Sequence, residues 1–197
     1  MSAAPSRPVV GIILFDDVEV LDFAGPYEVL SAASHESGEA CLKVLTVASK
    51  PQVTARGGLR VLVDAPIDDC PSLDALVVPG GPGADNPTAE QQKIIPFLQE
   101  RSRQARVVAS VCTGAFILGR AGLLDGHQAT THSHLLAPFR TEFPRVRVVE
   151  AKVVDESPII TAAGVSSGID LALYLLEQWF GPDVRRRSAA NLDGPWE

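Results

Sequence analysis

Short apolar segments, nearly unbroken by polar residues, recur along the chain and alternate with segments of helical spacing. Unbroken apolar runs of this length are typical of strands that are covered on both faces of a sheet. The predicted strands are 8–15, 41–49, 73–81, 106–111 and 128–132. The predicted helices are 22–34, 88–104, 113–124, 135–143 and 166–180. This alternation predicts a single α/β domain in which helices flank a mainly parallel sheet.

Two further segments predict strands that pair locally. Segment 52–66 has short apolar runs on either side of Gly57 and Gly58, which predicts a hairpin or a pair of short strands. Segment 145–164 divides into two strands around the polar turn 155–158.

Prolines and polar residues refine the expected helix ends. Pro26 is predicted to lie in the first turn of its helix, where a missing N–H is harmless. Thr88 and Gln91 have the spacing of a capping box, and Pro96 is expected to kink the helix that they begin.

Three distinctive turns follow predicted strands. An acidic loop follows Phe15, a glycine-rich turn follows Val78, and Cys112 follows Val111. In open parallel sheets, ligands bind beyond the carboxyl ends of the strands. We therefore expect these three turns to meet at one edge of the sheet and to form a site.

Composition narrows the classes of protein to consider. The 197 residues suit one domain, with 46% hydrophobic and 21% charged residues. The formal net charge of −7 argues against nucleic acid as a partner, because nucleic-acid binding needs a clustered basic surface. No apolar run approaches the roughly 20 residues of a membrane-spanning helix, so no membrane partner is expected.

The predicted domain occupies residues 8–184, with a disordered lead-in at 1–7 and a C-terminal tail at 185–197. The lead-in lacks the apolar stretch of a signal peptide, so we expect a cytoplasmic location with reduced thiols. The three cysteines match no zinc-site spacing, and His132 and His134 have no evident third ligand nearby. No metal site is therefore expected.

Cys112 stands where a buried strand ends and a helix begins with Thr113. A thiol at such an elbow lies at the positive end of the helix, which favours the thiolate and lowers the thiol pKa. The Thr113 amide is also placed to stabilise an anion formed by attack of the sulfur. Free cysteines often serve only as packing residues, and we expect that role for Cys41 and Cys70. The position of Cys112 instead favours a nucleophile.

Four segments, in order along the chain, carry a resemblance to a known family. They are GIILFDDVEVLDFAGPYEVL, LVVPGGPG, SVCTG with LGRAGLLDGHQATTH behind it, and AAGVSSGIDLALYL. The chain thereby resembles the ThiJ/PfpI superfamily, which is related in fold to class I glutamine amidotransferases. The resemblance implies a three-layer, flavodoxin-like sandwich. It points to the branch that contains isocyanide hydratase and the N-terminal domains of certain AraC-type regulators.

The resemblance implies roles for residues around Cys112. Asp22, in an L-D-x-x-G-P motif, would be its carboxyl partner, with a raised pKa and a proton to donate. From the residue alone, Asp22 is also suited to be a helix N-cap. Gly80 and Gly81 would bring backbone amides to the reacting centre, where the Gly81 amide and the Thr113 amide would form an anion hole.

The resemblance also bears on two side chains near the site. The Thr113 hydroxyl would contact the nucleophile or the substrate. From its position near the end of a later strand, His132 would either line the pocket or be solvated or structural, and a solvated or structural role is favoured for His134. Threonine stands where peptidase-type members carry a histidine after the cysteine, which argues against a Cys-His protease.

The function implied by the resemblance is that of a cofactor-free hydratase, a lyase. It would add water to an isonitrile and release an N-substituted formamide through a thioimidate on Cys112. The expected partners are a small electrophilic substrate and a second copy of the chain, because homodimers are common in the superfamily. Two alternatives stay open: a glyoxalase-, deglycase- or amidase-like enzyme, and a redox- or ligand-sensing module with an oxidisable Cys112.

Overall fold

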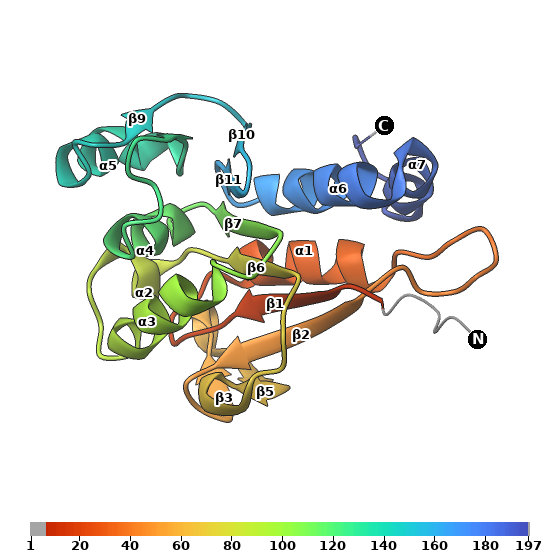
Figure 1. The fold of residues 1–197 in the computed structure, drawn as a ribbon, viewed down its shortest axis with the longest axis horizontal. Coiled ribbons are helices and arrows are strands. Elements are labelled where there is room, and N and C mark those ends of the chain that lie inside the picture. Colours follow the sequence, from red (N-terminus) through yellow and green to blue (C-terminus); the bar gives the residue numbers. More distant parts are fainter. Residues whose placement is uncertain (1–6, 197) are drawn as a thin grey trace.

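A seven-stranded sheet forms the centre of the molecule in a computed structural model that describes residues 7–196 (Figure 1). Its strands are β1 (Val9–Ile13), β2 (Lys43–Ala48), β5 (Ala65–Pro66), β6 (Ala75–Val78), β7 (Val107–Val111), β10 (Val153–Glu156) and β11 (Ile159–Ala162). Their order across the sheet is β10-β11-β7-β6-β1-β2-β5. Neighbouring strands are parallel except β10 and β11, which confirms the predicted mainly parallel sheet.

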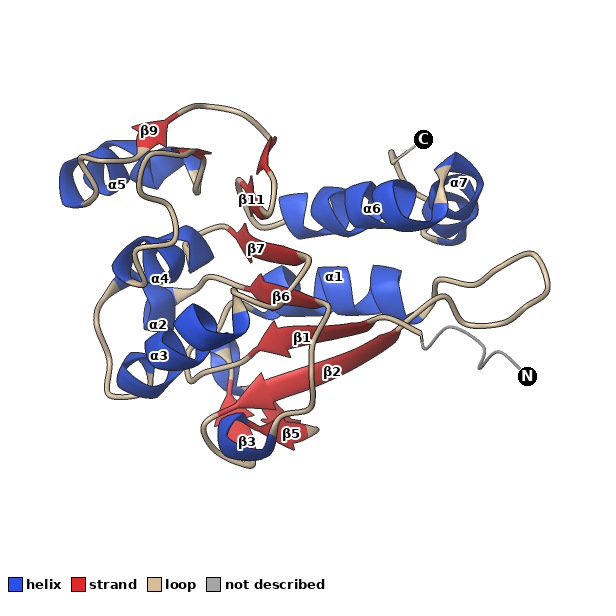
Figure 2. Ribbon diagram, in the orientation of Figure 1, coloured by secondary structure: helices blue, strands red, loops and turns tan. Residues whose placement is uncertain are grey.

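Helices flank this sheet in two groups (Figure 2). They are α1 (Val20–Ser31), α2 (Pro82–Asp85), α3 (Gln91–Arg101), α4 (Gly114–Arg120), α5 (Leu136–Glu142), α6 (Ser167–Phe180) and α7 (Pro182–Asn191). One group contains α1, α6 and α7, and the other contains α2, α3 and α4, with α4 packed on β6 and β7. Every residue of β6 and β7 is buried, as expected for strands that are covered on both faces. The molecule therefore has the predicted single-domain, flavodoxin-like α/β architecture.

Short strands complete the fold. The predicted hairpin is present as β3 (Gln52–Thr54) and β4 (Arg60–Leu62), which are antiparallel and are joined by a 3-10 turn. It docks on the loop after β1, because Asp17 N donates to Thr54 O at 2.9 Å and Arg56 N donates to Val18 O at 2.9 Å. A further parallel pair, β8 (Gln128–Ala129) and β9 (Arg147–Val148), precedes the antiparallel pair of β10 and β11.

Two helix starts differ from the predictions. The chain is anchored just before α1 by Glu19 N, which donates to Gly80 O at 2.8 Å, and the helix begins at once, at Val20. Pro26 therefore lies inside α1 rather than in its first turn. Only half of the capping box forms at α3. Thr88 Oγ1 accepts from Gln91 N at 3.3 Å, but the Gln91 side chain bonds elsewhere.

The structure describes the C-terminal end of the chain more fully than the N-terminal end. All of the predicted lead-in 1–7 except Arg7 lies outside the described residues. Helix α7 takes up most of the described part of the segment expected as a C-terminal tail, and it packs against α6. Across residues 7–196, none of the helices combines the length and the apolar character that crossing a membrane requires.

Candidate active site

The three turns that follow β1, β6 and β7 meet at one edge of the sheet. These strands are adjacent and parallel, so their carboxyl ends lie together, as the sequence predicted. A cavity of about 330 Å³ opens there. Its lining residues are Glu19, Arg56, Gly81, Pro82, Asp85, Cys112, Thr113, His132, His134, Leu135 and Val165. The candidate nucleophile therefore faces a space large enough for a small molecule.

Cys112 forms a strained and firmly held elbow between β7 and α4. Its φ angle is 54°, a left-handed value that residues other than glycine seldom adopt. Cys112 N donates to Ala163 O at 2.8 Å, and Thr131 Oγ1 donates to Cys112 O at 2.8 Å. The next turn is tight as well, because a Cβ at Gly114 would lie 2.0 Å from Val78 O. Strain maintained in this way is typical of functional sites.

Asp22 lies in the first turn of α1, completely buried, and its carboxyl group meets the Cys112 thiol. Its Oδ2 accepts from Gly80 N at 2.9 Å. Its Oδ1 has no partner by hydrogen-bond geometry among residues 7–196. The N-cap position of α1 is occupied by Glu19, so the capping role considered for Asp22 is wrong.

The pKa values of Asp22 and Cys112 are both raised. Burial raises the pKa of Asp22 to about 7, and the hydrogen bond from the Gly80 amide opposes this rise. Burial also raises the pKa of Cys112 to about 12; the Asp22 carboxylate adds to the rise, whereas the Thr113 amide lowers it. The predicted rise for Asp22 is confirmed. The predicted fall for Cys112 is wrong, because desolvation and the carboxylate outweigh the helix terminus. Between these two pKa values the pair holds one proton, on the sulfur.

The glycine turn after β6 reaches the site, but not in the predicted arrangement. Gly81 N donates to Thr113 Oγ1 at 2.8 Å, so this amide is already engaged rather than free for an anion. The Thr113 hydroxyl likewise faces Gly81, with its oxygen 3.3 Å from Gly81 O. Gly80 packs so closely that a Cβ there would lie 2.5 Å from both Thr113 N and Thr113 Oγ1. Glycine at position 80 is therefore what allows Asp22 and Thr113 to approach each other.

Histidines form part of the cavity wall. His132 is half-buried and lines the cavity, as one of the two readings of its position predicted. Its Nδ1 accepts from His134 N at 3.3 Å, which orients the ring. His134 also lines the cavity and is exposed, which agrees with the solvated position that the sequence favoured for it. Among the described residues no group of three or more His, Cys, Asp or Glu side chains is arranged to hold a metal ion.

Three charged lining residues were missed by sequence reasoning. Glu19 lies just before α1, Arg56 comes from the β3–β4 hairpin, and Asp85 ends α2. Arg56 Nη1 and Glu19 Oε2 form an ion pair at 2.6 Å. The one available signal was the acidic loop after β1, and nothing in the sequence indicated that the hairpin would fold over it.

Helix α2 is held in place from behind by two side chains. Arg120 Nη1 donates to Ala84 O and Arg120 Nη2 donates to Asp85 O, both at 2.7 Å. Gln91 Nε2 donates to Gly83 O at 2.9 Å, and Gln91 Oε1 accepts from Arg120 Nη1 at 3.1 Å. These bonds join α3 and α4 to the short segment that carries Asp85 into the cavity.

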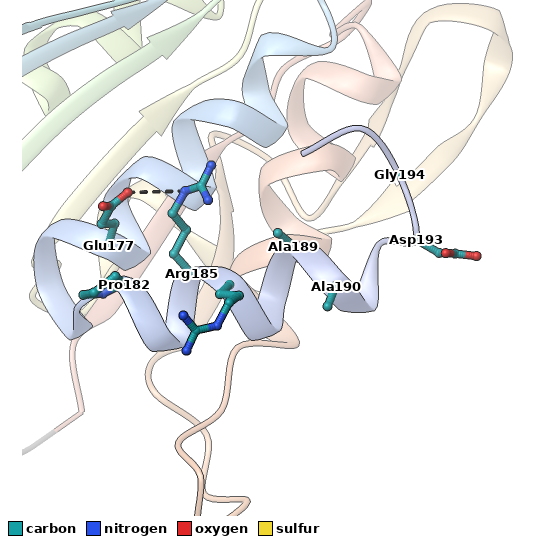
Figure 3. Close-up of a pocket in the computed structure, with 8 residues that line it drawn as sticks. Glu177, Pro182, Arg185, Ala189, Ala190, Asp193 and Gly194 are labelled. Carbon is teal, nitrogen blue, oxygen red and sulfur yellow. Dashed lines mark ion pairs between the residues drawn. The ribbon is translucent and has the colours of Figure 1, made fainter. Parts of the chain in front are cut away.

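A larger cavity of about 690 Å³ lies beside α6 and α7, where Arg185 Nε pairs with Glu177 Oε2 at 3.3 Å (Figure 3). Figure 1 places α7 on the opposite side of the molecule from the carboxyl ends of the strands. None of the site residues predicted from the sequence lines it.

The chain resembles known proteins over most of its length. It is 38% identical to the isonitrile hydratase of Pseudomonas putida, an alignment that covers 93% of this chain and 77% of that protein. It is 31% identical to the HTH-type transcriptional regulator GbdR of Pseudomonas aeruginosa, over 89% of this chain but only 47% of the regulator. The chain thus spans about half the length of that regulator.

Solved structures agree on the fold. A crystal structure of a ThiJ/PfpI family protein from Pseudomonas syringae superposes with a TM-score of 0.82 at 25% identity, covering 99% of this chain and 81% of that one. The pattern that defines the DJ-1/PfpI family matches residues 9–178. Because this pattern matches most of the chain, and because 38% of the aligned residues are identical to those of the hydratase, the chain belongs to the DJ-1/PfpI family.

Proposed function

We propose that the protein is a cysteine-dependent hydratase that converts small isonitriles into N-substituted formamides. The observation that carries this proposal is the contact between a buried carboxyl group, Asp22, and a thiol on a strained elbow, Cys112. The similarity to isonitrile hydratase supports the choice of substrate. A cavity of about 330 Å³ suits a small substrate.

The first step needs a sulfur nucleophile and a proton; the thiol provides both, and the carboxylate passes the proton on. The Cys112 thiol proton passes to Asp22, and the sulfur forms a bond to the terminal carbon of the isonitrile. Asp22 then gives the proton to that same carbon, which leaves a thioimidate, R–N=CH–S–Cys112. In the second step water adds to this carbon and the C–S bond breaks. The products are the formamide, R–NH–CHO, and the original thiol, and no cofactor is needed.

The backbone around the pair has a positioning role in this scheme. The Gly80 amide holds one oxygen of Asp22, so the carboxyl group stays directed at the reacting centre. The Thr113 amide favours the sulfur anion, as its effect on the thiol pKa indicates. The bond from the Gly81 amide to the Thr113 hydroxyl braces these two turns against each other.

Incubation of the purified protein with a simple alkyl isonitrile tests this proposal. We expect formamide to accumulate with the wild-type protein and not with Cys112→Ala, and to form far more slowly with Asp22→Asn. Consumption of methylglyoxal, measured in parallel, identifies a glyoxalase-like activity instead. An intact thiol without formamide production overturns the hydratase assignment.

The regulator relatives support a second candidate, a sensing module in which Cys112 is oxidised or binds a ligand. Dilute peroxide distinguishes the two. A sensor forms a sulfenic or sulfinic acid at Cys112 ahead of Cys41 and Cys70, and it turns over none of the electrophiles tested.

We also propose a cytoplasmic homodimer. Tyr27 and Leu21 are exposed apolar residues on α1 and are suitable for an interface between copies. Light scattering is expected to give twice the 20.9 kDa of the chain. A monomer mass at micromolar concentration contradicts this.

A further inference from the structure

Negative charge is in excess around the cavity that contains Cys112. From its balance of charges we infer that the cavity admits uncharged or cationic electrophiles and excludes anionic ones. Where it names a substrate class, this inference rests on the proposed function.

The guanidinium group at the cavity already has an anionic partner. Arg56 is the one Lys or Arg among the lining residues that the structure describes. Its Nη1 lies 2.6 Å from Glu19 Oε2, so its charge is largely balanced before any substrate arrives. The backbone bond from Arg56 N to Val18 O places this residue beside Glu19, so a bound anion would have to compete with the Glu19 carboxylate for the guanidinium.

Asp85 adds a carboxylate that forms no ion pair among residues 7–196. Its Oδ1 is buried and has no hydrogen-bond partner among residues 7–196. The carboxylate acts through space on both sides of the cavity, because it raises the pKa of Arg56 and contributes to the raised pKa of Cys112. Arg120 is nearby, but it bonds to the Asp85 carbonyl and its own charge is paired with Glu142 at 2.9 Å.

An anionic substrate would therefore meet repulsion without a compensating ion pair. Once ionised, Asp22 adds a further negative charge beside the sulfur. Concave sites with low-dielectric walls concentrate such fields and change association rates by about 10 to 1,000-fold. The expected substrates are small isonitriles whose substituent is neutral or bears an amine, and carboxylate-bearing ones are excluded.

Matched thiol reagents test this without any assay of turnover. Methyl methanethiosulfonate is neutral, its trimethylammonioethyl analogue is cationic and its sulfonatoethyl analogue is anionic. Each transfers its S–R group to the Cys112 thiolate, which forms a mixed disulfide and releases methanesulfinate. The rate of labelling at Cys112 is followed by peptide mass spectrometry, and the same reagents are timed against mercaptoethanol to correct for intrinsic reactivity.

The ratio of cationic to anionic rates is expected to exceed that of mercaptoethanol by about tenfold or more at low salt, and to shrink as salt is added. Asp85→Asn lowers the ratio and Arg56→Gln raises it. Asp183→Asn, which removes a carboxylate on α7 that pairs with Arg186, leaves the ratio unchanged and is the matched control.

A ratio equal to that of mercaptoethanol, or one that Asp85→Asn does not alter in a folded variant, overturns the inference. Failure of the proposed function has a separate signature. If neutral, ammonium-bearing and carboxylate-bearing isonitriles all give no formamide, the hydratase assignment fails while the labelling ratios still decide the charge selection.

Discussion

At the scale of single residues, Cys112 and Asp22 act as one chemical unit. The nearby thiol favours the carboxylate, and the carboxylate in turn disfavours loss of the thiol proton. The carboxylate no longer opposes loss of the thiol proton when an electrophile both bonds to the sulfur and accepts that proton. The carbon of an isonitrile accepts both.

Replacing Asp22 by Asn is expected to lower the pKa of Cys112, because the nearby carboxylate is one of the causes of its rise to about 12. The pH at which alkylation of Cys112 by iodoacetamide reaches half its maximal rate should fall by about one unit or more. Peptide mass spectrometry measures alkylation at Cys112 separately from that at the other two cysteines.

Asp16→Asn is a suitable control, since Asp16 is a half-buried carboxylate in the loop before α1 and pairs with Lys50. Its alkylation profile should match that of the wild-type protein. If the Asp22 variant alkylates with an unchanged profile, the two groups are not coupled.

The elbow could be predicted from the sequence because a buried strand and a helix start are both local patterns. The pKa of Cys112 could not, because its main cause is burial, and burial depends on what the rest of the chain packs over the sulfur. Asp22 is an intermediate case. Its pairing with Cys112 followed from a motif resemblance rather than from the residue itself.

At the scale of elements, α2 depends on its neighbours for its position. It has only four residues, too few to be stable as an isolated helix. Arg120 on α4 and Gln91 on α3 bind three of its backbone carbonyls, at Gly83, Ala84 and Asp85. The placement of Asp85 in the cavity therefore depends on side chains that do not themselves line it.

Replacing Arg120 by Met is expected to free the carbonyls of Ala84 and Asp85 and to destabilise the protein by about 1–3 kcal/mol. Amide hydrogen exchange should accelerate in residues 82–86, while urea unfolding measures the loss of stability. Arg120→Lys should recover only part of it, because an ammonium group lacks the fork that reaches two carbonyls.

Glu142→Gln separates this effect from the surface ion pair. It removes only the partner of Arg120 Nε, a carboxylate whose side chain is 40% exposed, and should change the free energy of unfolding by less than about 1 kcal/mol. Unchanged hydrogen exchange at 82–86 in Arg120→Met would show that α2 does not need the arginine.

Element patterns gave the sheet and most helices, but not these contacts. The spacing of Thr88 and Gln91 suggested a capping box, yet the Gln91 amide binds carbonyls five to eight residues earlier in the chain. Likewise the hairpin was recognisable, whereas its docking beside Val18 was not. Short-range spacing predicts which elements form, and contacts between elements are settled by three-dimensional packing.

At the scale of the whole molecule, the buried acid links stability to pH. The pKa of Asp22 is about 7 in the folded protein, against an ordinary value of 3.8. Between these values the native state keeps a proton that the unfolded chain has released. The free energy of unfolding should therefore fall as the pH rises from about 4 to 7, with a slope of at most about 1.4 kcal/mol per pH unit from this group.

Urea unfolding of the wild-type protein and of Asp22→Asn at pH 5 and pH 7 measures this contribution. All other titrating groups are common to both proteins, so the difference between their pH dependences isolates Asp22. The wild-type protein should lose more stability over this interval than the variant. Equal losses would place the pKa of Asp22 near its ordinary value.

The order of strands β7, β6 and β1 has a consequence for redesign. The segments that directly follow these three central strands carry the sulfur, the glycine turn and the acid, whereas two of the three charged lining residues come from the hairpin and from α2. Randomising position 56 in the hairpin and the exposed position 134, both of which line the cavity, would alter which molecules enter and leave the reactive pair untouched. The fold is therefore a scaffold in which one reaction could be applied to new substrates by replacing residues that line the entrance.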